Sequence, residues 1–163
     1  MHDLRGTSSL MPTRPGHRYV NVLGLLADVG RLFTPRPWPG GGPPPGKPGA
    51  CYVDSVLWAS ESPDGLAYVE GVTWTGLYPL EHAWCADRDG TVLDPTWERP
   101  GLAYLGLPVR ADAAARLMWE NRGPLLAYGT ALCADWLRNG VPGELLVDVG
   151  RQIPEGDVIP PVL

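Results

Sequence analysis

Three residues that can do nucleophilic chemistry follow one another along the chain in the order Cys51, His82 and Asp94. A cysteine attacks a carbonyl carbon as its thiolate, and an imidazole held in one tautomer by a carboxylate is a common way to generate that thiolate. Taken singly, Cys51 at a helix start favours a nucleophile over a core cysteine, whereas His82 alone favours a structural histidine and Asp94 alone a turn residue before Pro95. Taken together they predict a catalytic triad in which Cys51 is the nucleophile, His82 the base and Asp94 the residue that orients the imidazole.

Cys51 is expected in the first turn of a helix. Apolar residues from Tyr52 to Leu57 recur at helical spacing, and Pro63, with the Asp-Gly pair after it, ends the run. The N-terminus of a helix stabilises an anion through its unpaired amides and its dipole. The Gly-rich segment before Cys51, from Gly46 to Gly49, also leaves room for a substrate backbone near the sulfur.

Strands are expected on both sides of the histidine. Three segments rich in β-branched and aromatic residues are separated by turn residues, which predicts three antiparallel strands. These segments are Leu66 to Trp74, Glu81 to Asp87 and Thr91 to Trp97.

The loop between the last two strands decides whether His82 and Asp94 can meet. If residues 88–90 form a three-residue loop with Gly90 in the left-handed conformation, both side chains lie on one face of the hairpin. A two-residue Asp-Gly turn would instead place Asp94 opposite Cys85, on the other face. The triad therefore requires the longer loop.

The remaining elements are predicted from apolar spacing and turn residues. They are a helix over Tyr19 to Phe33, helices over Asp112 to Asn121 and Pro124 to Asn139, the second ending at Gly140, and a short strand over Leu145 to Val149. The predicted class is α+β.

At 163 residues the chain is predicted to form one domain, covering residues 1–163. Its parts are an arm over 1–16 expected to lack order, a Pro/Gly-rich connector over 35–49 and a catalytic core over 50–108.

Composition argues against several function classes. The net charge is −5 and the sequence pI is about 5.1, with scattered basic residues, so nucleic-acid binding is not expected. Three widely spaced cysteines suggest neither a disulfide framework nor a zinc site, so no metal or cofactor is predicted. With no signal peptide and no run of about 20 apolar residues, we expect a soluble, cytoplasmic protein with no membrane segment; the oligomeric state stays open.

The motifs around the triad resemble the transglutaminase-like branch of the papain-like cysteine enzymes. The local strings are Cys51-Tyr52-Val53-Asp54-Ser55, Tyr68-Val69-Glu70-Gly71, His82-Ala83-Trp84 and Asp94-Pro95-Thr96-Trp97, and they are similar to small uncharacterised bacterial and phage proteins. The resemblance spans about residues 49–108. It implies a nucleophile helix packed on a small antiparallel sheet, with extra C-terminal helices, and the triad roles given above.

The rest of the site is less defined. Papain-type proteases have a Gln upstream of the Cys, whereas the single Gln here is Gln152, so the oxyanion would need the Cys51 amide and another donor. That donor is a Trp84 or Trp74 indole or an amide of the Gly-rich segment. Glu70, Trp84 and Trp74 are predicted to bind substrate. Glu70 at an exposed edge fits the sequence equally well, and aromatic strand residues are more often core than site.

We therefore expect a cysteine-dependent hydrolase or acyltransferase that acts on an amide bond of a protein or peptide through a thioester, as a peptidase, deamidase or transglutaminase-like enzyme. The alternative is a catalytically inactive papain-like fold that serves a phage or bacterium as a protein-interaction module.

Overall fold

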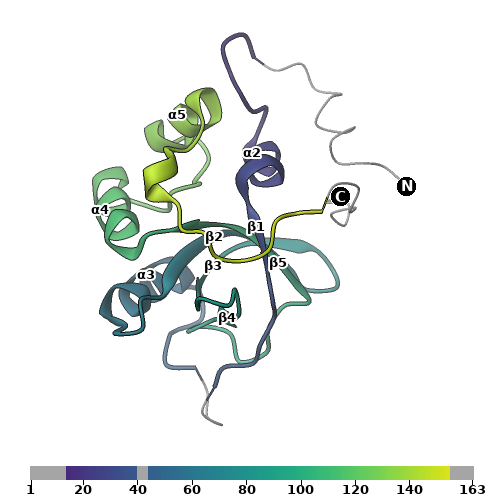
Figure 1. The fold of residues 1–163 in the computed structure, drawn as a ribbon, viewed down its shortest axis with the longest axis vertical. Coiled ribbons are helices and arrows are strands. Elements are labelled where there is room, and N and C mark those ends of the chain that lie inside the picture. The colour runs from purple at the N-terminus through teal and green to yellow at the C-terminus, as the bar shows by residue number, and fades with distance from the viewer. Residues whose placement is uncertain (1–13, 40–43, 155–163) are drawn as a thin grey trace.

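The computed structural model describes residues 14–39 and 44–154. Its centre is a curled antiparallel sheet of five strands in the order β1-β5-β2-β3-β4 (Figure 1). The strands are β1 (Arg31–Phe33), β2 (Ala67–Trp74), β3 (Pro79–Ala86), β4 (Val92–Leu93) and β5 (Ala103–Val109).

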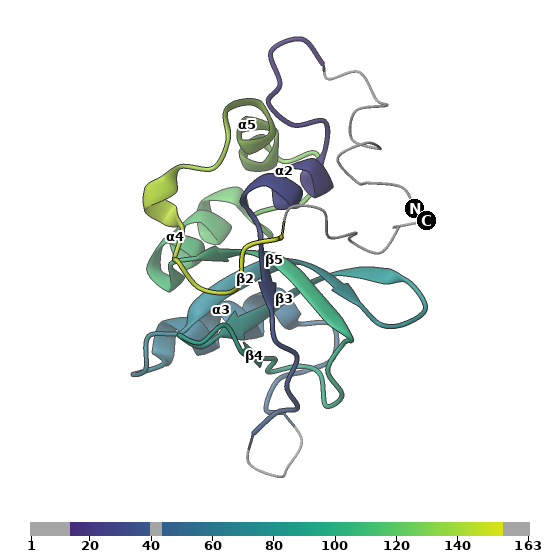
Figure 2. The same cartoon turned by 45° about the vertical axis from the view of Figure 1, so that its right-hand side comes forward.

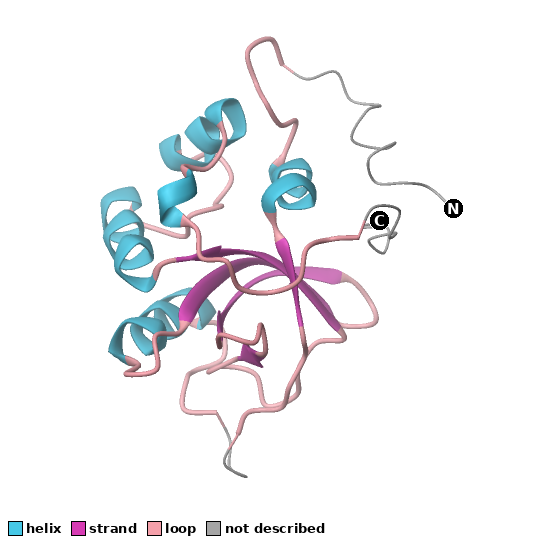
Figure 3. Cartoon of the chain, viewed as in Figure 1, coloured by secondary structure: helices cyan, strands magenta, loops and turns pink. Residues whose placement is uncertain are grey.

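Four α-helices and one 3₁₀ turn occur in the described residues, and Figure 3 colours them apart from the strands. They are α2 (Val22–Val29), α3 (Cys51–Glu61), α4 (Ala111–Asn121), α5 (Ala131–Asn139) and the 3₁₀ turn η1 (Gly143–Leu145). α3 packs against β3, β2 and α4, whereas α2 packs against β5; Figure 2 gives a second view of this arrangement. The expected α+β class is confirmed.

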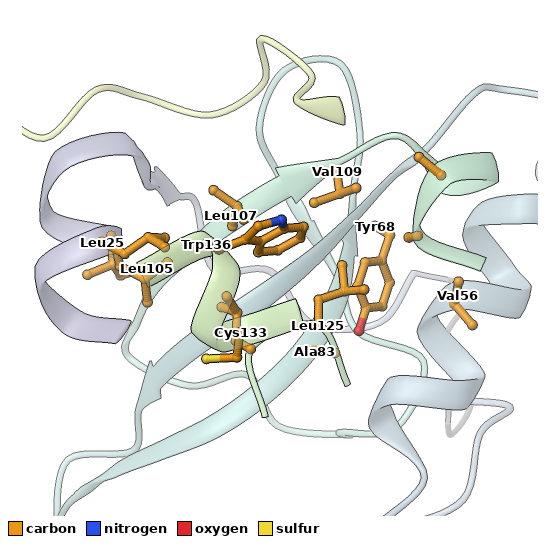
Figure 4. Close-up of a cluster of buried hydrophobic side chains, with 14 of the residues drawn as sticks. Leu25, Val56, Tyr68, Ala83, Leu105, Leu107, Val109, Leu125, Cys133 and Trp136 are labelled. Carbon is orange, nitrogen blue, oxygen red and sulfur yellow. The ribbon is translucent and has the colours of Figure 1, made fainter. Parts of the chain in front are cut away.

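Side chains alternate across the sheet, and each face carries its own core. The helix-bearing face packs against all four helices, with Tyr68, Leu107 and Trp136 among its buried members (Figure 4). The opposite face packs a smaller aromatic core around Trp84 and Phe33. His82 lies on this second face, because it is two residues before Trp84 on β3.

The predicted helix at Cys51 is confirmed, and so is the helix that begins near residue 112. Four other expectations were wrong in extent or type. The helix expected over 19–33 covers only Val22–Val29, after which Gly30 leaves the helical conformation and β1 follows. The helix expected over 124–139 begins only at Ala131, where the Thr130 hydroxyl accepts from the Cys133 amide.

The strand expected over 91–97 is limited to Val92–Leu93, because the residues after it turn back around the Asp94 carboxylate. The strand expected over 145–149 is the end of a 3₁₀ turn followed by irregular chain, in which Leu146 makes a single bridge to Val109. β1 and β5 were not predicted. The arm expected over 1–16 lies mainly outside the described residues.

No helix among residues 14–39 and 44–154 is both long and apolar enough to cross a membrane.

Candidate active site

Cys51 is the first residue of α3, and one turn later the helix is fixed to the sheet. The Ser55 hydroxyl donates to the Ala83 carbonyl at 3.1 Å, and the Cys85 thiol donates to the Ser55 carbonyl at 3.1 Å. These two hydrogen bonds join α3 to β3, the strand that carries the predicted base. The N-cap residue Ala50 makes no side-chain hydrogen bond to the helix, so no capping side chain competes with an anion for the amides beside Cys51.

The hairpin between β3 and β4 has the three-residue loop that the triad requires. The Asp87 amide donates to the Thr91 carbonyl at 3.1 Å, and the Asp87 carboxylate accepts from the amides of Asp89 (3.0 Å) and Thr91 (2.9 Å). Gly90 has a φ of 76°, the left-handed conformation that was predicted. In the resulting register Cys85 pairs with Leu93, so the two triad positions share the opposite face.

Asp94 lies directly after β4 and uses both of its carboxylate oxygens. Oδ1 accepts from the Thr96 amide (2.9 Å), the Thr96 hydroxyl (3.0 Å) and the Trp97 amide (3.1 Å). Oδ2 lies 2.6 Å from His82 Nε2. Because Asp94 is only 2 % exposed, these partners replace the water that a carboxylate would otherwise need. The turn therefore fixes the carboxylate in an acceptor role toward the imidazole.

His82 is buried between aromatic rings and holds a proton tightly. Its ring stacks on Trp97 with a centroid separation of 4.0 Å and on Trp84 at 6.2 Å. Burial alone lowers the pKa of His82, but hydrogen bonds to Asp94 and to the Cys51 side chain, together with the negative charges of those partners, raise it to about 9. Because Nε2 is hydrogen-bonded to Asp94, the ring nitrogen that can face Cys51 is Nδ1.

The segment that leads into Cys51 is bonded to the turn that holds Asp94. The Gly46 amide donates to the Pro95 carbonyl at 2.6 Å, and the Lys47 amide donates to Asp54 Oδ2 at 2.8 Å. A Cβ atom at Gly46 would lie 2.4 Å from the Pro95 carbonyl oxygen. Glycine is thus required at position 46 for this close approach, a different role from the open access for substrate that the sequence suggested.

Trp84 does not line a substrate site. It is fully buried, and its ring makes edge contacts with Phe33 (5.7 Å) and Tyr104 (5.0 Å). Its indole Nε1 is buried and has no hydrogen-bond partner among the described residues. Trp74 lies on the face opposite His82, because Gly71 is the register partner of His82. Trp84 therefore lies in the core behind the predicted site, and Trp74 lies on the opposite face of the sheet.

Glu70 also lies on the helix-bearing face and is neither at an exposed edge nor beside His82. Its carboxylate accepts from the Tyr68 hydroxyl (2.8 Å) and from the amides of Leu125 (2.9 Å) and Leu126 (2.7 Å). Burial raises the pKa of Glu70 to about 6, while these hydrogen bonds lower it. The residue thus anchors the 125–126 turn to β2.

Trp97 is part of the site, although the sequence did not place it beside His82. It follows β4, so strand parity gave no reason to place it beside His82. The available signal was its position three residues after Asp94, where an Asp side chain commonly accepts from the backbone. That turn carries the Trp97 ring onto the imidazole.

The other two cysteines are separate from this arrangement. Cys85 and Cys133 are 1 % and 2 % exposed, respectively, and burial raises the pKa of both thiols, that of Cys85 to about 12. Cys51, at 9 % exposed, is the most accessible of the three.

Within the described part of the chain, no group of three or more His, Cys, Asp or Glu side chains is arranged to hold a metal ion. Comparisons with family models, curated proteins and solved structures gave no match to this chain. The likeness to transglutaminase-like enzymes accordingly stays a prediction, and the arrangement of Cys51, His82 and Asp94 is the ground on which a function can be argued.

Proposed function

We propose that the protein is a cysteine-dependent hydrolase or acyltransferase that acts on an amide bond through a thioester on Cys51. The observation that carries this proposal is the buried imidazole of His82, which has Asp94 Oδ2 at 2.6 Å and lies near enough to the Cys51 side chain for that group to raise its pKa. A nucleophile, a base and an orienting carboxylate in contact are the features shared by triad enzymes on unrelated folds.

In the proposed reaction, His82 Nδ1 takes the proton of the Cys51 thiol, and the thiolate attacks the carbonyl carbon of the amide. The negative charge that develops on the carbonyl oxygen is stabilised by the amides at the start of α3. The imidazolium then gives its proton to the leaving amine, the C–N bond breaks and a thioester remains. Water or a second amine, deprotonated by His82, attacks the thioester and releases the Cys51 thiolate.

Asp94 keeps the imidazole in the useful orientation throughout this cycle. Its Oδ2 accepts from Nε2, so the exchangeable proton of the catalytic steps is at Nδ1. A pKa of about 9 means that His82 holds a proton readily near neutral pH, which favours an ion pair with a Cys51 thiolate. A protein or peptide remains the substrate class that we propose.

Rates of alkylation at the three cysteines test the proposal without knowledge of the substrate. The folded protein is treated with iodoacetamide at pH 7, and the modified cysteines are identified by peptide mass spectrometry. Cys51 should react at least tenfold faster than a simple alkyl thiol at this pH, because it is paired with the imidazolium. Cys85 and Cys133 should stay unmodified, since both are buried.

Burial alone would protect Cys85 and Cys133 from alkylation. The deciding test therefore compares the alkylation rate of Cys51 in wild type with that in a His82 variant. His82→Gln keeps a polar side chain at position 82 but cannot hold the proton, and it should remove the excess reactivity of Cys51. A Cys51 that reacts at the same rate in wild type and His82→Gln, with both proteins folded by circular dichroism, would leave the inactive interaction module as the better interpretation.

A further inference from the structure

A cavity of about 260 Å³ lies beside the start of α3 and is not lined by Cys51, His82 or Asp94. At about 30 Å³ for each water, it has room for roughly nine waters, which suits one long side chain better than a drug-sized ligand. Its apolar walls include Val22 and Leu23 of α2 and Leu126 of the turn before α5. The cavity therefore suits an elongated group with an apolar stem.

The charged residues that line this cavity are both acidic. Glu70 lies on β2 and is 3 % exposed, whereas Glu81 on β3 is exposed; no Lys, Arg or His is among the lining residues. Glu70 forms no ion pair with any residue of the described chain. Its hydrogen bonds to the Tyr68 hydroxyl and to two backbone amides satisfy the carboxylate but supply no positive charge.

A buried carboxylate without a cation is unusual, because burying a charge is costly unless an opposite charge compensates it. Here Glu81 adds a second negative charge, which disfavours ionisation of Glu70 further. A cation in the cavity would relieve both effects. Its stem would contact the apolar walls, as the stems of Lys and Arg do on other proteins.

The cavity adjoins the proposed nucleophile. Tyr52, which lines it, is the residue after Cys51, and Gly71, which also lines it, is the register partner of His82. The cavity is therefore placed near enough to hold one part of a molecule whose acyl group is at Cys51.

We propose that this cavity binds the basic side chain of a peptide substrate, with its aliphatic stem against α2 and its cationic head near Glu70 and Glu81. The proposal rests on the proposed function, because it makes the cavity a specificity site for the amide that Cys51 attacks. It narrows the substrate class to peptides with Lys or Arg near the reactive bond.

Binding can be measured without catalysis in the full chain carrying Cys51→Ser. The probes are Nα-acetyl-lysine amide and its uncharged counterpart Nα-acetyl-norleucine amide, titrated by NMR. The lysine probe should bind at least tenfold more tightly. Glu81→Gln should weaken it at least threefold, whereas Glu61→Gln, an exposed change at the far end of α3, should leave it unchanged.

Two further variants separate charge from shape. Ala127→Phe fills the cavity from its partly exposed rim and should abolish binding of both probes. Glu70→Gln should weaken the lysine probe more than Glu81→Gln does, but it also breaks hydrogen bonds to buried amides, so Glu81→Gln is the variant that decides. Equal affinity for the two probes, or tight lysine binding that survives both Glu81→Gln and Ala127→Phe, would overturn the proposal.

The placement beside Cys51 is tested in the wild-type chain. Saturating lysine probe should slow iodoacetamide alkylation of Cys51 at least threefold, and norleucine probe at the same concentration should not. If the lysine probe binds but alkylation of Cys51 is unchanged, the cavity is not part of the substrate site of Cys51. The enhanced reactivity of Cys51 would still support the catalytic proposal. Conversely, lysine binding to a protein whose Cys51 has no enhanced reactivity would reject the catalytic proposal but not the cationic site.

Discussion

At the residue scale, the imidazole of His82 is held by two different kinds of contact. The Asp94 carboxylate fixes its proton arrangement, and the Trp97 ring fixes its plane. Neither contact leaves room for solvent, since both His82 and Asp94 are 2 % exposed. The protonation state of this pair should therefore affect reactivity and stability together.

Asp94→Asn tests the orienting role. The Asn Oδ1 atom can still accept from Thr96 and Trp97, so the turn should persist, but the amide then points NH₂ at His82 Nε2. The ring must place its proton on Nδ1, the wrong tautomer for accepting the Cys51 proton. We expect the alkylation rate of Cys51 at pH 7 to fall at least tenfold and the free energy of unfolding to fall by about 1–3 kcal/mol.

The matched control is Asp89→Asn, at an exposed position in the same hairpin loop, which should change neither quantity appreciably. Urea titration and timed alkylation measure both effects on the same samples. Undiminished alkylation in folded Asp94→Asn would reduce the triad to a dyad.

The pH dependence of stability follows from the raised pKa of His82. A histidine whose pKa is about 9 when folded and about 6.5 when unfolded binds its proton more tightly in the native state. Its contribution is fully present below pH 6.5 and is lost as the pH rises through 9. On this basis the contribution is on the order of 3 kcal/mol.

Urea unfolding of Cys51→Ser, with and without His82→Gln, between pH 6 and 9.5 isolates the part of this contribution that comes from Asp94, because Cys51, whose protonation is coupled to that of His82, is absent from both chains. The difference between the two free energies should shrink as the pH rises. A difference that stays constant across this range would mean that His82 is not protonated in the native state.

At the element scale, the β3–β4 hairpin depends on Gly90 for two reasons. Its φ of 76° is unfavourable for other residues, and a Cβ atom there would lie 2.8 Å from the Cα of Gly150. Gly65 has a φ of 68°, but a Cβ atom added there would meet no other atom within 4 Å, so only the first reason applies to it. The two glycines thus separate backbone strain from crowding.

We expect Gly65→Ala to reduce the free energy of unfolding by about 1 kcal/mol, and Gly90→Ala to reduce it by about 2–4 kcal/mol. Because Gly90 sets the register that brings Asp94 to His82, its substitution should also slow alkylation of Cys51. Equal destabilisation by the two changes would show that the contact with Gly150 is not important.

The elements that sequence reasoning found are those with local signals. The loop Arg88-Asp89-Gly90 and the helix that begins at Cys51 are specified by residues adjacent to them. β5 was missed because Gly106 and Pro108 are unfavourable in strands, yet each has a tertiary reason to be there. A Cβ atom at Gly106 would lie 2.7 Å from the Trp84 ring, and the Pro108 carbonyl accepts from Val147, on the side away from β2.

The overlong helix expected over 124–139 has a similar explanation. Its first residues have helical apolar spacing, but the amides of Leu125 and Leu126 bind Glu70, at least 55 positions earlier in the chain. Such a contact is not visible in a local window. For the same reason the sequence predicted His82 and Asp94 as neighbours but could not place Trp97, whose position depends on the turn around Asp94.

At the scale of the whole molecule, the two hydrophobic cores contribute differently to stability and to the reactivity of the site. The helix-bearing core is the larger one, and Trp136 of α5 lies within it at 1 % exposure. The smaller core supports the back of the site through Trp84. Stability should therefore depend mainly on the first core, and reactivity on the second.

Trp136→Ala should reduce the free energy of unfolding by about 3–5 kcal/mol through the cavity it leaves. Trp119→Ala, at a position 86 % exposed on α4, should change it by less than about 0.5 kcal/mol. Thermal and urea unfolding distinguish the two. The same small effect at both positions would mean that α5 does not pack on the sheet as described.

The hydrogen bond between the Gly46 amide and the Pro95 carbonyl has a consequence for how such a site can change over time. This hydrogen bond joins the connector before Cys51 to the turn after β4. The backbone positions of Cys51 and Asp94, which are far apart in the sequence, therefore depend on the same contact. An insertion that lengthens either segment would shift this contact and misplace Cys51 and Asp94 together. Variation in length should consequently be tolerated in the Leu77-Tyr78 hairpin tip, which is exposed and away from this contact, before it is tolerated between residues 44 and 50.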